Sequence, residues 1–140
     1  MRVLLSAILI CAGAPVALAQ SYSASGQVGY LQEWEMKASL VRTATSSGED
    51  FSGPVTLRHV GLCSVNGVEE KSGTVRLRVS AKSSAIEGTL VMKDDSCRLT
   101  ASASRSHSGL LSCRDGQGVP INFSIERSGG DASGPQAATK

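Results

Sequence analysis

Residues 75–92 have the sequence VRLRVSAKSSAIEGTLVM and contain the pattern that recurs along most of the chain. Apolar side chains largely alternate with polar or charged ones in residues 75–81 and again in residues 86–93. Alternation is typical of a β-strand with one buried face, because successive side chains point to opposite sides of a sheet. A four-residue turn at residues 82–85 then predicts an antiparallel hairpin in which Leu77 faces Leu90.

Three further hairpins place their apolar residues on the same face. Turns at residues 93–96, 104–106 and 116–118 would set these pairs opposite each other: Leu90 and Leu99, Leu99 and Leu111, and Leu111 and Phe123. Sequential hairpins that share one buried face form an up-and-down meander, and about eight such strands can close into a small barrel. We therefore predict an all-β fold, an antiparallel meander of 7–8 strands closed as a small barrel. An open sheet or a sandwich is the alternative.

The N-terminal part of the meander is less regular. Residues 28–40 form one long alternating run, and a bend near Gly29 or Gln32 would divide it into two strands. The polar stretch 43–52 that follows is predicted to be a loop.

The hairpin after this loop contains an Asn66-Gly67 pair, which is typical of a two-residue turn. That turn would set Leu57 opposite Arg76, on the wrong face. A three-residue turn at residues 66–68, or a bulge at Gly61 or Gly73, sets Leu57 opposite Leu77 instead.

The first 19 residues have the organisation of a secretory signal peptide. A positively charged start, Met1-Arg2, precedes an apolar stretch and the small-x-small site Ala17-Leu18-Ala19. We expect cleavage after Ala19 and a periplasmic or extracellular protein. A lipoprotein signal at Cys11 and a retained N-terminal anchor are the alternatives.

The rest of the chain divides into a β-barrel domain at residues 20–127 and a tail at residues 128–140. The tail is rich in Gly, Ser and Ala and has few apolar side chains, so we expect it to be disordered. The composition, with 41% hydrophobic and 19% charged residues and a net charge of +2, fits one globular domain. Such a small net charge gives no indication of a nucleic-acid partner or of membrane insertion after cleavage.

Three cysteines remain after the signal peptide. The predicted register sets Cys97 opposite Cys113 across a hairpin, where a disulfide can close in an oxidising compartment. Cys63 is then left over, either as a buried free thiol or as a link between two molecules.

One belt of the predicted barrel interior is unusually small. Its residues are Val79, Gly88, Ala101, Gly109 and Ile125, and Trp34 is expected to lie beside them. Small inward residues either let a sheet curve sharply, with Trp34 or Tyr30 filling the space, or leave a ligand pocket.

The sequence contains no catalytic constellation. Glu33 and Glu35 share a strand face, but Lys37 continues the same face and indicates a solvated stripe. His59 and Cys63 are about 13 Å apart along a strand, beyond hydrogen-bond reach. We find no metal-ligand spacing and no cofactor motif.

These observations predict an exported, non-enzymatic binding domain, such as an inhibitor-like protein that binds another protein through loops at residues 43–52 and 64–71. A carrier of a small apolar ligand is one alternative. An envelope structural component linked through Cys63, or a small hydrolase that uses His59, is another. The protein is expected to be a monomer, or a dimer through Cys63.

Overall fold

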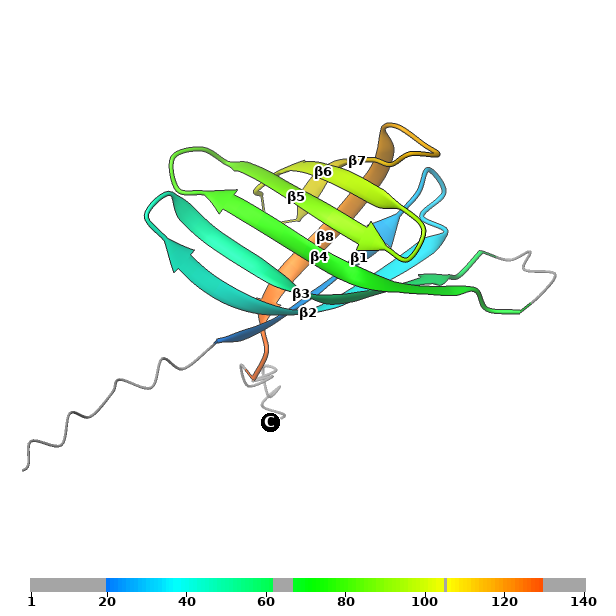
Figure 1. Cartoon of the computed structure of the whole chain (residues 1–140), viewed down its shortest axis with the longest axis horizontal. Coiled ribbons are helices and arrows are strands. Elements are labelled where there is room, and N and C mark those ends of the chain that lie inside the picture. Colours follow the sequence, from blue (N-terminus) through cyan, green and yellow to red (C-terminus); the bar gives the residue numbers. More distant parts are fainter. Residues whose placement is uncertain (1–19, 62–66, 105, 130–140) are drawn as a thin grey trace, which may run out of the picture.

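The computed structural model describes residues 20–61, 67–104 and 106–129, which form an eight-stranded antiparallel barrel (Figure 1). The strands are β1 (Ser21–Val28), β2 (Trp34–Thr45), β3 (Gly48–His59), β4 (Glu70–Ser80), β5 (Ala85–Met92), β6 (Ser96–Ser102), β7 (His107–Ser112) and β8 (Val119–Arg127). Each strand pairs with the next, as the predicted up-and-down meander requires. The predicted signal peptide, Cys63 and most of the predicted tail lie outside the described residues.

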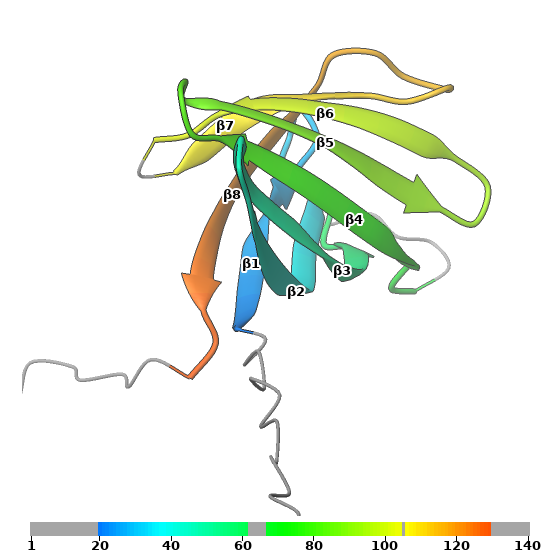
Figure 2. The ribbon, with the colours of Figure 1, turned by 60° about the vertical axis from the view of Figure 1, so that its left-hand side comes forward.

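Pairing of β1 with β8 closes the barrel. Tyr22 lies opposite Arg127 at one end of this pair, and Val28 lies opposite Ile121 at the other. Figure 2 shows the start of β1 beside the end of β8. Closure leaves no strand edge unpaired, so the predicted barrel is confirmed and the open sheet and the sandwich are excluded.

The predicted inward face is confirmed, but three of the four predicted registers are wrong. Leu99 does lie opposite Leu111. The other pairs are shifted by two or four residues: Leu77 faces Gly88, Leu90 faces Cys97, and Leu111 faces Val119. Even shifts keep every side chain on its own face, so alternation alone does not distinguish these registers and the turn geometry decides between them.

The long N-terminal run bends where the sequence allows it. β1 ends at Val28 and β2 begins at Trp34, with Gly29 and Gln32 between them in positive-φ conformations of 108° and 55°. Tyr30 therefore lies in a turn with 72% of its surface exposed, and does not point into the barrel as strand parity suggested.

The prediction that residues 43–52 form a loop was wrong. This stretch contains the end of β2, a turn at Ser46-Ser47 and the start of β3, in which Phe51 is buried. The error has a physical cause, because charged residues of this hairpin pair across strands. Asp50 forms an ion pair with Arg78 on the outer face, and Arg42 forms one with Glu49 on the inward face, near the open end of the barrel.

The β3–β4 hairpin has a longer connection than the predicted three-residue turn. The His59 N–H donates to the Glu69 carbonyl at 2.8 Å, and Leu57 lies opposite Lys71. Phe51, not Leu57, is opposite Leu77.

Aliphatic side chains supply most of the core. The buried hydrophobic residues are Ala24, Val28, Met36, Ala38, Leu40, Phe51, Val55, Leu57, Val75, Leu77, Ile86, Leu90, Cys97, Leu99, Leu111, Ile121 and Phe123. They form one cluster that fills the middle of the barrel.

The small belt reflects close approach between strands. A Cβ atom on Gly109 would lie 2.6 Å from the Cβ of Ala101, and one on Gly88 would lie 2.7 Å from Leu77 Cδ2. Aromatic rings pack near this end: Tyr22 meets Phe51 edge-on at 5.2 Å between centroids, and His107 lies 5.1 Å from Phe123. These rings, and not Trp34 or Tyr30, occupy the end of the barrel at which β2 joins β3.

Candidate binding site at the disulfide end of the barrel

Four connections lie together at one end of the barrel, on the right in Figure 1: β1–β2, β3–β4, β5–β6 and β7–β8. They frame a hollow of about 610 Å³, which we call the mouth. Its lining residues are Val28, Gly29, Tyr30, Glu33, Trp34, Leu57, Glu70, Lys71, Leu90, Met92, Lys93, Asp94, Asp95, Cys97, Leu111, Cys113, Asp115 and Val119. The inward residues of the strands give the mouth an apolar floor, and the connections give it a charged rim.

Hydrogen bonds between connections hold the rim. The Tyr30 hydroxyl donates to the Gly118 carbonyl at 3.1 Å, which joins the β1–β2 and β7–β8 connections. The Val60 N–H donates to the Glu33 carbonyl at 2.7 Å, which joins β1–β2 to β3–β4. Loops fixed to one another lose little conformational entropy when they bind a partner.

A disulfide closes the β6–β7 side of the mouth, as predicted. Cys97 and Cys113 are bonded, with Cα atoms 4.1 Å apart. The Cys113 N–H donates to the Gly116 carbonyl at 2.7 Å, so the two cysteines are not a hydrogen-bonded strand pair. This is the geometry in which the predicted cross-hairpin bridge can form.

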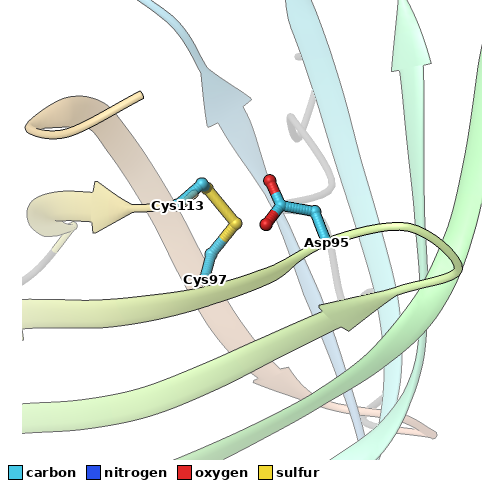
Figure 3. A group of neighbouring side chains, drawn as sticks. All are labelled: Asp95, Cys97 and Cys113. Atoms are coloured by element: carbon cyan, nitrogen blue, oxygen red, sulfur yellow. A yellow bond between two sulfur atoms is a disulfide. The ribbon is translucent and has the colours of Figure 1, made fainter. Parts of the chain in front are cut away.

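The carboxylate of Asp95 points toward this disulfide (Figure 3). Asp95 Oδ1 accepts hydrogen bonds from the Ser96 N–H at 2.8 Å and from the Arg114 N–H at 3.2 Å. The carboxylate and the two sulfur atoms lie within 4.8 Å of one another. Both sulfurs are engaged in the disulfide, so neither is a thiolate that a metal ion would bind.

Three inward side chains form a stack at the β2–β3–β4 side of the mouth. Trp34 and His59 are opposite each other in the register, with ring centroids 4.9 Å apart and an edge-to-face arrangement. The ammonium group of Lys71 lies over the Trp34 ring, 4.8 Å from its centroid. The sequence did not predict this cluster. Its three residues lie far apart in the chain and are brought together only by the β2–β3 and β3–β4 registers.

Carboxylates outnumber cationic groups around the mouth. Its acidic lining residues are Glu33, Glu70, Asp94, Asp95 and Asp115, and its basic lining residues are Lys71 and Lys93. Lys71 is next to Glu70 on β4, and Lys93 is next to Asp94 in the β5–β6 connection. The mouth therefore has a negative rim over an apolar floor.

Exposed apolar side chains lie on two of the connections at this end of the barrel, and one of them, Tyr30, lines the mouth. Tyr30 and Leu31 on the β1–β2 connection are 72% and 88% exposed, and Val60 and Val68 on the β3–β4 connection are 48% and 59% exposed. Strand parity placed Tyr30 inside, so this patch depends on the turn geometry.

The residues expected to line a pocket are divided between places. Trp34 lies in the mouth, and Gly88 lies opposite buried Leu77 on the inward face of β5, while also bordering a hollow on the outer face. The other four lie at the opposite end of the barrel and are partly buried: Val79, Ala101, Gly109 and Ile125.

The two predicted contact loops are also separated. Residues 43–52 surround the β2–β3 turn, and the described residues 67–71 lie at the opposite end of the barrel. Glu33 accepts a hydrogen bond from the Leu31 N–H within the β1–β2 turn, whereas Glu35 on β2 pairs with Lys37 at 3.2 Å. Glu35 and Lys37 therefore lie together on the predicted stripe, and Glu33 lies in the turn that precedes β2.

The hollow on the outer face has a volume of about 570 Å³, and its basic lining residues are Arg76, Arg78 and Arg98. Arg78 donates two hydrogen bonds to Asp50, at 2.9 and 3.0 Å. These bonds hold the pKa of the Asp50 carboxyl below its usual range. Asp50 lies opposite Arg78 because residues 48–59 form a strand, so the sequence interpretation of a loop missed this neutralising partner.

Comparison with protein-family models found no match to this chain, and comparison with curated proteins found none. No helix within residues 20–61, 67–104 and 106–129 is long and apolar enough to cross a membrane. The candidate site is therefore argued from its own geometry.

Proposed function

We propose that this chain is an exported, non-enzymatic binding protein that uses the mouth and its rim to bind another protein. The observation that carries the proposal is the set of exposed apolar residues beside the mouth, above all Tyr30 and Leu31. Large apolar side chains held in water on a fixed loop are typical of interaction surfaces. The apolar floor of the mouth and its acidic rim would form a recess for a side chain of the partner.

The filled interior supports a mouth-bound partner over a ligand enclosed within the barrel. Leu90, Leu99 and Leu111 are each 2% exposed and fill the centre of the barrel below the mouth. A bound group would therefore rest on these side chains and remain partly open to solvent.

Site-specific photocrosslinking tests this proposal. A photoreactive amino acid at position 31 is compared with the same amino acid at position 47, in the β2–β3 turn at the opposite end. We expect position 31 to crosslink to one partner of defined mass in the envelope fraction of the producing cell, and position 47 to give no such product. Introducing Val68→Asp should reduce the crosslink from position 31.

Equal crosslinking from both positions would show non-specific contact and would contradict the proposal. Absence of a product from position 31 would contradict it as well.

A small-ligand carrier is the second candidate, because a volume of about 610 Å³ lies within the usual range of ligand pockets. Native mass spectrometry of the oxidised protein tests it. A reproducible adduct that is lost on unfolding would favour the carrier, and a bare protein would favour the protein partner. The same spectrum would show whether the chain is a monomer or a dimer through Cys63.

A further inference from the structure

The Lys71 ammonium group lies over one face of the Trp34 ring, 4.8 Å from its centroid, and both residues line the mouth. An aromatic face attracts cations through its quadrupole, and indole is the strongest of the aromatic side chains in this respect. We propose that the partner inserts a cationic side chain, lysine or arginine, into the mouth, where it displaces Lys71 from Trp34. This inference rests on the proposed function and specifies the chemistry of the group recognised.

Lys71 is held weakly enough to be displaced. Its side chain is 52% exposed, and its ion pair with Glu69, at 3.3 Å, is also exposed. Exposed ion pairs contribute little to stability because water and salt screen them. Lys71 is therefore a replaceable occupant of the ring face and not a fixed structural cap.

The charges around the mouth favour a cation over an anion. Glu70 is adjacent to Lys71 in sequence, and Asp94, Asp95 and Asp115 line the β5–β6 and β7–β8 sides. An arriving ammonium or guanidinium group meets an excess of carboxylates, whereas an arriving carboxylate meets repulsion. The apolar floor accommodates the aliphatic stem of a lysine or arginine, whose methylene groups pack on apolar surface while the charged group remains near water.

Trp34 provides a direct signal for the test because it is the single tryptophan of the chain. The probes are N-acetyl-arginine amide and N-acetyl-citrulline amide, which have nearly the same shape and differ in charge. We expect the arginine compound to change Trp34 fluorescence saturably, with an affinity that falls as salt is added. The citrulline compound should bind much more weakly.

Substitution of Lys71 then separates displacement from simple charge attraction. In Lys71→Gln the ring face has no competing cation, so we expect the arginine compound to bind about two- to fivefold more tightly. Lys82→Gln removes the same charge at the opposite end of the barrel and should leave the affinity unchanged. The double variant Asp94→Asn, Asp115→Asn should weaken binding without altering the fold, because both side chains are exposed.

Equal binding of the arginine and citrulline compounds would overturn the inference. An affinity that is the same in Lys71→Gln and in the unmodified protein would overturn it too. If crosslinking from position 31 persists while the arginine compound fails to bind, the cationic group is wrong and the proposed protein partner stands. If the arginine compound binds and position 31 yields no crosslink, the proposed protein partner is wrong.

Discussion

Asp95 and Arg114, 19 residues apart in sequence, are joined by a hydrogen bond of 3.2 Å from the Arg114 N–H to the Asp95 carboxylate. The same carboxylate oxygen accepts the Ser96 N–H at 2.8 Å. It thereby ties the β5–β6 turn to the β7–β8 connection, directly beside the Cys97–Cys113 disulfide (Figure 3). A covalent bond and a charge-assisted hydrogen bond together fix this side of the mouth.

We expect Asp95→Ala to destabilise the protein by about 1–2 kcal/mol, because two backbone donors lose a charged acceptor. Asp94→Ala, at the neighbouring exposed position, should change the free energy of unfolding little. Urea unfolding of the oxidised variants measures both. A similar loss in the two variants would show that the Asp95 carboxylate does not tie the connections together.

Removal of the disulfide should have a larger effect. The bond closes a loop with a sequence separation of 16, for which chain-entropy arguments give about 3 kcal/mol. We expect this loss of stability in the double variant Cys97→Ala, Cys113→Ser. Both this variant and its reference carry Cys63→Ser, so that the Cys63 thiol cannot exchange with the disulfide. Unfolding of the Cys63→Ser protein in reductant is the matched measurement, and a midpoint unaffected by reductant would contradict the prediction.

Gly109→Val tests whether the small belt is a close contact or an unfilled space. A Cβ at this position would lie 2.2 Å from the Thr100 carbonyl oxygen and 2.6 Å from the Ala101 Cβ, so we expect a destabilisation of about 2 kcal/mol or more. Ser108→Val adds the same side chain to the exposed face of the same strand and should be nearly neutral. A Gly109→Val protein as stable as the original would instead indicate free volume at this end.

His107 should make stability depend on pH. Burial lowers the pKa of His107 below its usual value of 6.5, against a smaller opposing effect of the Ser102 backbone. The unfolded chain therefore binds a proton at a higher pH than the folded protein does. The contribution of His107 to the free energy of unfolding should be constant above pH 7. It should decrease as the pH falls from 6.5 through the lowered pKa.

His107→Gln should remove this part of the pH dependence. Urea unfolding at pH 7.5 and pH 5.5 measures it in both proteins. An equal loss of stability on acidification in the two proteins would assign the effect to other groups.

The alternation of residues such as Val75, Leu77 and Leu90 determined the fold class without any tertiary information. Each apolar residue at a period of two had to be buried, and sequential hairpins with one buried face have few ways to cover it. The same alternation paired Cys97 with Cys113, because both share the inward face of one hairpin. It was insufficient for the register, since a shift of two residues buries the same side chains.

Local composition was misleading where charged side chains pair across strands. Residues 43–52 contain one large apolar side chain, Phe51, besides two carboxylates and several hydroxyls, and this composition is typical of a loop. In the barrel, Glu49 meets Arg42 and Asp50 meets Arg78, which satisfies the charges of a regular strand. The partners that stabilise this strand lie up to 28 residues away in the sequence.

The sequence by itself determined the strand faces, the disulfide pair and the bend near Gly29, because each depends on local alternation, spacing or backbone freedom. Only the tertiary structure decided which residues line the mouth that we propose as a binding site. Closure of the barrel brings Trp34, Lys71 and Asp115 to one mouth, and leaves Tyr30 and Leu31 exposed at its rim. These residues come from different hairpins, and their positions depend on the registers and turns that the period-two pattern does not specify.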